Sequence, residues 1–270
     1  MASYYQQFDA DINRDIPAES YGGWKNAEIE LSLANTAVVV MHAWDCGTPE
    51  KFPGWYRCVE YIPRAQAIAR DVFPPLLAAV RSSPLPLFHV ISGHEKGKET
   101  DGYRRAVALA ADLPAPKYPW AAPDPALLKL REFRRNNVFV GRHNEDDVNR
   151  GFAATDFIPQ ASPLEHEGIA ENWQQLFALC RDSNINHLIY MGFAINYCLL
   201  SSPGGMIDMH KIGVMCSCFR EAVTAVENKE SARTEAFKEQ GLWRTALSFG
   251  FVFDVAPFIT ALQKLPMTEK

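Results

Sequence analysis

The segment His187–Cys198, HLIYMGFAINYC, carries a cysteine in a setting that favours nucleophilic chemistry. An apolar, strand-like run ends at Gly192, and a short polar turn then delivers Cys198 onto a helix start. The positive end of a helix dipole and unpaired backbone N–H groups both favour the thiolate form of a cysteine. Backbone N–H groups in the same turn can also hold an oxyanion. The segment therefore indicates attack of a thiolate on a carbonyl carbon.

Polar and aromatic side chains also follow other predicted strands. The run TAVVVM, Thr36–Met41, is apolar and rich in β-branched residues, which is typical of a strand buried on both faces of a parallel sheet. Leu85–Ser92 and Asn137–Val140 are the second and third predicted strands. The side chains of interest beyond these three strands are those of His42, Trp44, Asp45, His94 and Arg142. Because parallel strands end at one edge of a sheet, where ligands bind, we expect these groups near Cys198.

The rest of the chain alternates helices with strands. Helices are predicted over Ile62–Ser82, divided or kinked at Pro74 and Pro75, and over Asn172–Arg181 and Tyr197–Ile212. Further strands are predicted over His187–Met191, Val214–Phe219 and Phe251–Val255. This alternation predicts an α/β protein, a three-layer α/β/α sandwich around a mostly parallel, doubly wound sheet. Residues 1–34 are predicted to form an N-terminal arm over a single domain, residues 35–270, with an insertion at about residues 94–135.

Composition narrows the class of partner. The chain has 270 residues, 47% of them hydrophobic, and a net charge of −5, which argues against nucleic acid or an anionic membrane surface. The polar, acidic start does not resemble a signal peptide, and no apolar run reaches the roughly 18 residues that span a bilayer. We therefore expect a cytoplasmic protein that acts on a small molecule. The six cysteines form no C-x-x-C pair, and Cys58, Cys180, Cys216 and Cys218 are expected to be reduced core residues.

The segment around Cys198 resembles the isochorismatase-like cysteine hydrolases, in which an apolar strand is followed by G-V-x-T-x-x-C and a helix. Gly192, Ala194, Asn196 and Cys198 match that pattern, and Ile195 stands where threonine is common. Other segments resemble family segments in the same order between Leu33 and Leu265; they are residues 36–41, 75–90, 137–142, 152–157 and 213–222. The resemblance implies the same three-layer fold and a homo-oligomer.

The resemblance also implies roles for single residues. The family uses an aspartate after the first strand as base, a lysine after the third strand as cation, and the cysteine as nucleophile. In this chain His42 and Arg142 stand at the first two positions. The family's oxyanion donors are the amides of the cysteine and of the residue after a non-proline cis bond. They correspond here to Cys198 and Ala194, with the cis bond at Phe193–Ala194.

Two interpretations remain open at this point. In the first, Cys198 hydrolyses a small amide or related C–N compound, with His42 as base and Arg142 as cation. Asp45 would then orient His42 or bind substrate, and Trp44 and His94 would line the pocket. In the second, loss of both partners removes catalysis, because such groups act as a unit. The domain would then be a small-molecule binder, a structural subunit or a protein-interaction module. No cofactor is predicted, and no metal, because His89 and His94 do not form a D-x-H pattern.

Overall fold

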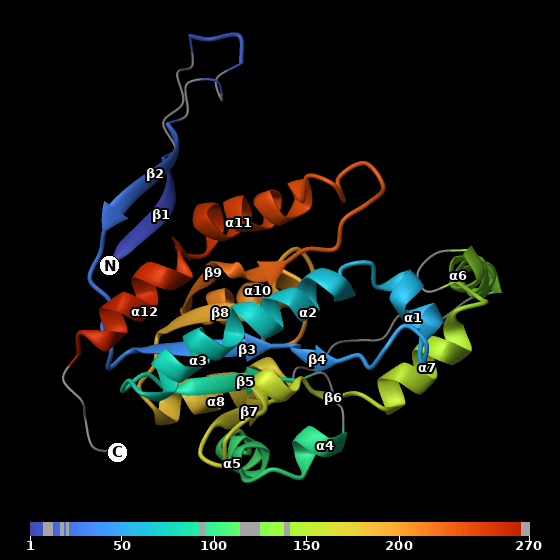
Figure 1. Ribbon diagram of the computed structural model, residues 1–270, viewed down its shortest axis with the longest axis horizontal. Helices are drawn as coiled ribbons and strands as arrows, with labels where there is room; N and C mark the ends of the chain where they lie inside the picture. The colour runs from blue at the N-terminus through green and yellow to red at the C-terminus, as the bar shows by residue number, and fades with distance from the viewer. Residues whose placement is uncertain are drawn as a thin grey trace.

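A central sheet organises the molecule (Figure 1). The computed structural model describes residues 1–7, 13–16, 19, 22–91, 95–113, 125–137 and 141–265. In this part of the chain the sheet has eight strands in the order β2-β1-β10-β9-β8-β3-β5-β7. Their bounds are β1 Ala2–Gln7, β2 Gly23–Glu28, β3 Thr36–Met41, β5 Leu87–Val90, β7 Gly168–Ala170, β8 His187–Phe193, β9 Met215–Thr224 and β10 Val252–Phe253. The six strands from β10 to β7 run parallel, as the sequence predicts.

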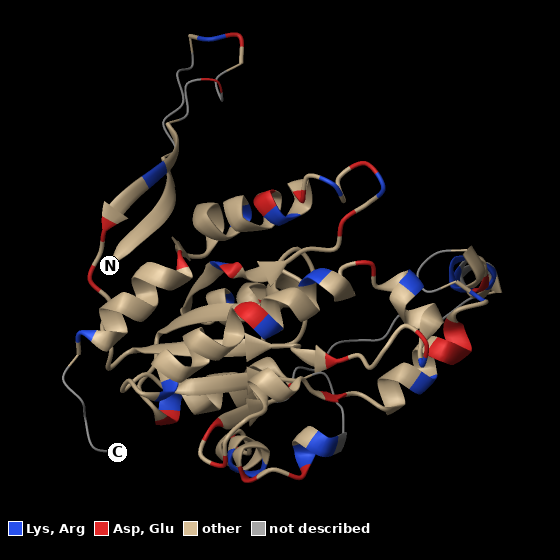
Figure 2. Cartoon of the chain, in the orientation of Figure 1, with Lys and Arg blue, Asp and Glu red and all other residues tan. Residues whose placement is uncertain are grey.

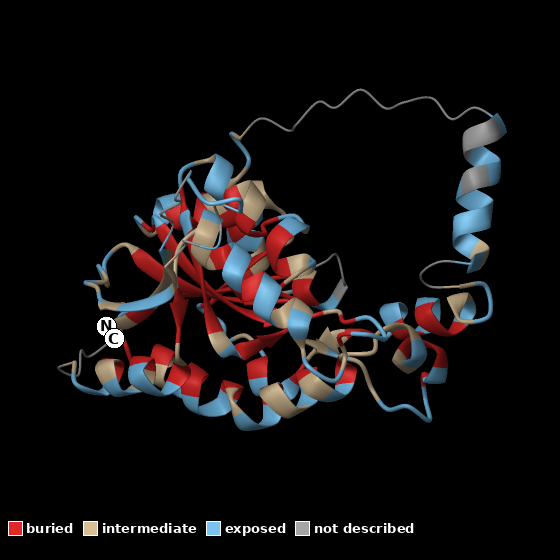
Figure 3. Cartoon of the chain, turned by 90° about the horizontal axis from the view of Figure 1, so that it is seen from above, coloured by how far each residue is buried: buried red, intermediate tan, exposed pale blue. Residues whose placement is uncertain are grey.

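Helices cover both faces of this sheet. One face packs on α2 Ile62–Asp71, α3 Phe73–Arg81 and α12 Val255–Gln263. The other packs on α5 Asp101–Leu109, α8 Trp173–Asp182, α9 Cys198–Ser201, α10 Met206–Lys211 and α11 Ala236–Ser248. Figure 3 shows buried residues concentrated on the strands and on the helix faces turned toward them. The predicted three-layer α/β/α sandwich is therefore confirmed.

The buried run of β3 shows why these residues form a central strand. All six of its residues are buried. Ala37, Val39 and Met41 contribute to one core layer, and Val38 and Val40 contribute to the other. Successive side chains of a strand point to opposite faces, so an uninterrupted apolar run serves both layers at once.

Proline and glycine divide two of the predicted helices. The helix predicted over Ile62–Ser82 is two helices, because α3 starts at Phe73 with proline in its first turn. Proline is tolerated there, where its missing N–H group would have no helical partner. The helix predicted over Tyr197–Ile212 is likewise separated into α9 and α10, with Pro203 and Gly204 between them.

Three parts of the chain differ from the sequence-based expectation. The N-terminal arm contributes two strands to the sheet, because β1 pairs antiparallel with β10 and with β2. Asn137, the first residue of the third predicted strand, is the last residue of helix α6, Pro125–Asn137, and residues 138–140 lie outside the described residues. The strand beside β5 is β7, whose three residues GIA give no apolar run to detect.

A small lobe and one short ladder lie beyond the sheet. The lobe contains α1 Pro53–Cys58 and α7 Glu145–Ala153, and α6 stands apart from the sheet beside them (Figures 1 and 3). Figure 2 shows charged residues gathered on α4 Glu95–Lys98, α6 and α7, whereas the strands are mostly uncharged. The ladder pairs β4 Trp44–Asp45 with β6 Asp156–Phe157. No helix among the described residues is long and apolar enough to cross a membrane.

A buried ionic cluster attaches the edge strand β7 to the rest of the sheet. The Glu167 carboxylate, directly before β7, accepts hydrogen bonds from Arg81 Nε at 2.7 Å and from the Leu164 amide at 2.9 Å. His89 Nε2 lies 2.8 Å from Glu167 Oε2, the oxygen that also accepts from Leu164. Burial opposes the charged form of Glu167, but the hydrogen bonds from His89 and Arg81 outweigh it and lower the pKa of the carboxyl group to about 2.

We predict that Glu167→Gln lowers the free energy of unfolding by about 2 kcal/mol at neutral pH. The pKa of a glutamate in the unfolded chain is roughly 4.3, and above that pH the ionised Glu167 contributes its full stabilisation. This contribution disappears as the pH falls toward the pKa of Glu167 in the folded protein. The difference between the two proteins should therefore shrink by about half near pH 3. Urea unfolding at several pH values measures it, with Asp71→Asn, which breaks an exposed pair with Arg70, as a control without effect. An equal difference at all pH values would contradict this account.

Candidate active site

The ends of β3 and β8 bring His42 next to the turn that carries Cys198. The two strands are parallel neighbours, and Met41 pairs with Gly192 at their carboxyl ends. His42 follows immediately, with φ at 52°, and is buried, with 6% of its surface exposed. Its amide bonds to the carbonyl of Val90 on β5, so His42 sits between the ends of β5 and β8.

Glycine is required at position 192 because the two backbones approach closely there. A Cβ atom at Gly192 would lie 1.9 Å from the carbonyl oxygen of Met41. Its φ of 123° is also one that other residues rarely adopt. The glycine in the sequence pattern therefore has a structural cause: it lets β8 end against β3.

The turn from Ala194 to Cys198 presents two unused amides. The Phe193–Ala194 peptide bond is cis, as the family resemblance implies. The carbonyl of Ala194 accepts hydrogen bonds from the amides of Tyr197 and Leu199, both at 3.1 Å, which closes the turn. Within the described part of the chain, the amides of Ala194 and Cys198 donate no hydrogen bond. Two such N–H groups beside a thiol are the components of an oxyanion hole.

Cys198 is half-buried and is the first residue of α9. Because α9 has only four residues, its dipole is small, and the free N–H groups of the turn provide most of the local positive field. The other thiols are in different surroundings. Burial raises the pKa of Cys46, Cys180 and Cys218 to about 12, and that of Cys216 further, so all four remain protonated at neutral pH.

Asn196 fixes the turn to the segment that follows β9. Its side-chain amide donates to the carbonyl of Val226 at 2.8 Å, and its side-chain oxygen accepts from the Val226 amide at 2.9 Å. The amide of Ile195 also bonds to the carbonyl of Thr224 at 2.8 Å. This reciprocal pairing explains why a polar residue stands between the buried Ile195 and Cys198.

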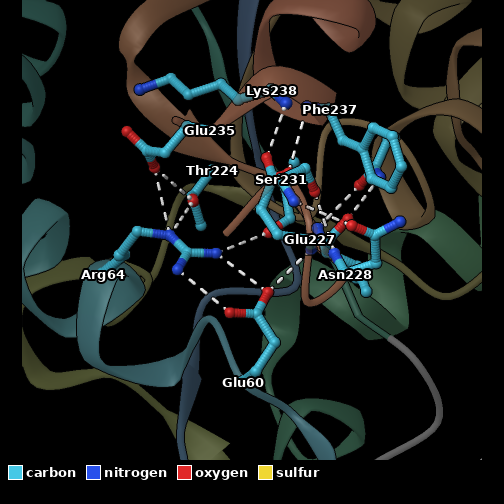
Figure 4. A network of polar contacts seen from close by, with 12 residues as sticks. Glu60, Arg64, Thr224, Glu227, Asn228, Ser231, Glu235, Phe237 and Lys238 are labelled. Atoms are coloured by element: carbon cyan, nitrogen blue, oxygen red, sulfur yellow. Dashed lines mark hydrogen bonds and ion pairs between the residues drawn. The ribbon is translucent and has the colours of Figure 1, made fainter. Parts of the chain in front are cut away.

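A polar network holds the segment after β9 in turn (Figure 4). Arg64 on α2 donates to both carboxylate oxygens of Glu60, and to Thr224 Oγ1 and the carbonyl of Ala225, each at 3.1 Å. Arg64 Nε also lies 3.1 Å from the carboxylate of Glu235. These contacts join α2 to the end of β9.

The same network reaches the start of α11. The carboxylate of Glu227 accepts hydrogen bonds from the amides of Phe237 and Lys238, at 3.1 and 2.9 Å, in the first turn of that helix. Its own amide bonds to the carboxylate of Glu60 at 2.8 Å. A carboxylate at a helix N-terminus satisfies open N–H groups and interacts favourably with the helix dipole. The segment that holds Asn196 is thus itself held from two sides.

The structure brings some of the predicted site residues together. The imidazole of His42 stacks on Trp44, with ring centroids 5.2 Å apart. Asp45 is exposed and accepts a hydrogen bond from the Gly47 amide at 2.9 Å, which is the geometry of a turn residue. His94 lies outside the described residues.

Arg142 is not at the sheet edge, so the prediction that it takes the lysine position is wrong. It is exposed in the turn between α6 and α7, where its amide bonds to the carbonyl of Asn136, and it forms no ion pair with any described residue. The third strand counted outward from β8 is β7, and the residue after β7 is Glu171. The Glu171 carboxylate accepts from Tyr103 and lies 3.5 Å from Lys98 Nζ on α4.

Tyr61 is a neighbour of Cys198 that the sequence did not reveal. It is half-buried just before α2. Burial raises the pKa of its phenol, and the thiols of Cys198 and Cys46 and the carboxylate of Glu60 act in the same direction. The phenol therefore remains neutral at ordinary pH, within range of charge interaction with the thiol. No sequence signal distinguishes it from the other aromatic residues of the loop before α2.

Two solved structures are similar to this chain. A cysteine hydrolase from Pseudomonas syringae pv. phaseolicola superposes with a TM-score of 0.50 and 15% identity, over 87% of this chain and 96% of its own. The chain has an isochorismatase-like fold. An isochorismatase-like hydrolase from Alkaliphilus metalliredigens is also similar, with a TM-score of 0.48 and 16% identity over 84% of this chain and 98% of its own. No family model matches the sequence, and no curated protein does.

The isochorismatase-like fold has accepted unusual residues around its cysteine in this chain. His42 stands where an aspartate is expected, and Glu171 follows the strand where a lysine is expected. Among the described residues, no three His, Cys, Asp or Glu side chains are grouped so that they could hold a metal ion. The thiol, the two amides, His42 and Tyr61 are the groups through which this site could act.

We predict that Asn196→Ala disturbs Cys198 specifically. Loss of two hydrogen bonds to Val226 should lower the free energy of unfolding by about 1–2 kcal/mol. Asn35→Ala is the matched control, because the Asn35 side chain donates to the carbonyl of Asn184 and accepts from Ser32 Oγ at the opposite edge of the sheet. Both variants should lose similar stability, but only Asn196→Ala should slow alkylation of Cys198, by roughly tenfold. Equal alkylation rates would contradict a positioning role for Asn196.

We also predict that alkylation of the folded protein distinguishes Cys198 from the buried cysteines. Iodoacetamide at about pH 7 should label Cys198 first, whereas Cys180, Cys216 and Cys218 should react only after unfolding. His42→Ala should slow labelling of Cys198 if His42 accepts the thiol proton, and Cys198→Ser identifies the labelled peptide by its absence. Mass spectrometry of digested protein over a pH series provides the rates. Labelling of Cys198 only at strongly alkaline pH, where ordinary exposed thiols also react, would contradict an activated thiol.

Proposed function

We propose that this chain is a cysteine-dependent hydrolase of small amides or related C–N compounds. The observation that carries the proposal is the turn after β8, where the half-buried Cys198 thiol lies among the unbonded amides of Ala194 and Cys198. Ala194 is fully buried, and buried backbone donors are nearly always paired, so its open amide favours a binding role for the turn. The likeness in fold to a cysteine hydrolase supports the same class of reaction.

The proposed reaction begins with attack of Cys198 Sγ on the substrate carbonyl carbon. The thiol proton passes to a ring nitrogen of His42, the S–C bond forms, and the carbonyl electron pair moves onto oxygen. The amides of Ala194 and Cys198 stabilise that oxyanion. The electron pair then returns, the C–N bond breaks, and the departing nitrogen takes the proton from His42. The products of this step are an amine or ammonia and a thioester at Cys198.

Water completes the cycle at the same site. It attacks the thioester carbon and gives a proton to His42 while the N–H groups again hold the oxyanion. The C–S bond breaks, the acid product leaves, and the sulfur regains its proton from His42. Stacking on Trp44 restricts the ring of His42, and Tyr61 adds a neutral phenol within range of charge interaction with the thiol. Both groups favour a defined position for the proton carrier and the nucleophile.

An inactive, ligand-binding domain is the competing hypothesis, and one observation favours it. The cation that the family resemblance places near the cysteine is not provided by Arg142, which is exposed beyond the sheet. A domain that retains the thiol and the amides but has lost the cation could bind an acyl group without releasing it. Turnover therefore separates the two hypotheses.

We predict that amide hydrolysis depends on Cys198 and His42 but not on Arg142. Cys198→Ser should lower the rate by at least about 10³-fold, and His42→Ala by roughly 10²–10⁴-fold. Arg142→Ala should leave the rate within about twofold, since its side chain is exposed in the turn between α6 and α7. Release of ammonia or amine from a panel of small amides, carbamates and ureas measures the effect. Absence of turnover across the panel, together with an unreactive Cys198, would support the inactive domain.

A further inference from the structure

A second concave site lies at the opposite edge of the sheet from Cys198. It is a cavity of about 450 Å³ at the amino ends of β3, β8 and β9, where Thr36, His187 and Met215 are the first residues of their strands. The N-terminal arm forms one wall through residues 29–32. β8 separates this cavity from the Cys198 turn by its full length, about 20 Å for a seven-residue strand.

A buried histidine is the central polar group of this cavity. His187 lines the cavity although only 8% of its surface is exposed. Its Nε2 lies 2.7 Å from Ser217 Oγ, and the same oxygen accepts a hydrogen bond from the Phe251 amide at 2.9 Å. The Ser217 hydroxyl has a second lone pair and a hydrogen of its own, so it can serve Nε2 in either tautomer of the ring. Nδ1 is the ring nitrogen left for a ligand.

The surroundings of His187 select the kind of ligand. Burial lowers the pKa of its imidazole to about 4, so the ring is neutral near pH 7 and offers one N–H donor. Leu31, Met215 and Phe251 provide apolar walls. Glu30 is the one charged side chain among the described lining residues, so an anion would be repelled rather than held.

We propose that this cavity binds a neutral aromatic carboxamide. Its amide group, which has both an N–H donor and a carbonyl acceptor, pairs with His187 Nδ1, and the ring lies against Leu31, Met215 and Phe251. The volume lies within the range of small-molecule sites, which combine apolar walls with a few fixed polar groups. Since the site and the Cys198 turn share no residue, the inference is independent of the proposed hydrolase activity.

The test uses benzamide as the probe and the full-length Cys198→Ser protein, so that no turnover can occur. Titration with NMR detection of the histidine ring nitrogens should give a saturable shift of the His187 signals. Benzoate should bind at least tenfold more weakly than benzamide. A shift that does not saturate, or equal binding of benzoate, would overturn the proposal.

Two variants locate the site without depending on His187. Met215→Trp should fill the cavity and weaken benzamide binding at least tenfold, with little effect on folding, because Met215 is 43% exposed. Val107→Trp is the matched control on α5, where the original side chain is also 43% exposed, and it should leave the affinity unchanged. Ligand-detected saturation transfer gives both affinities. Equal weakening by the two variants, or no weakening by Met215→Trp, would overturn the assignment to this cavity.

Discussion

The parallel register of β3 and β8 determines where every group of the candidate active site lies. Pairing runs from Thr36 and His187 to Met41 and Gly192, so both strands end at the same level. A shift of this register by one residue would reverse the faces of all side chains in a strand that serves two core layers. His42 and the Cys198 turn are therefore fixed by the packing of the central sheet. The absence of a Cβ atom at Gly192 permits this arrangement at the point of closest approach.

The turn itself depends on a second set of restraints that come from outside the sheet. Asn196 attaches the turn to Val226. The segment around Val226 is held by Arg64 from α2 and by the hydrogen bonds that the Glu227 carboxylate accepts from the first turn of α11. A functional group is positioned accurately when its supporting side chains are themselves held by hydrogen bonds. The network of Figure 4 is of this kind, because the side chains of Arg64, Glu60 and Glu227 each have a partner on another element.

Long, strongly patterned segments made the fold predictable. The apolar run of β3, the strand-turn-cysteine segment of β8 and the alternation with helices are local signals, and the structure contains all of them. β7 escaped prediction because three residues carry too little pattern. β1 escaped because its pairing with β10 is a long-range contact, and β2 joins the sheet through β1. The error over Arg142 follows from the missed strand β7. With β7 undetected, Asn137–Val140 was the nearest candidate for a third strand, and Arg142 follows it. Tyr61 and the cavity around His187 arise only when distant segments meet, so local sequence could not reveal them.

The central claim is that Cys198 forms an acyl intermediate held by the amides of Ala194 and Cys198. Its most direct test is intact-protein mass spectrometry after brief exposure to an activated acetyl ester, with peptide mapping to locate the added group. The account predicts one acetyl group on Cys198 that is lost again at neutral pH, and no such group in Cys198→Ser. Acetylation of surface lysines alone, or a stable adduct on another cysteine, would contradict it.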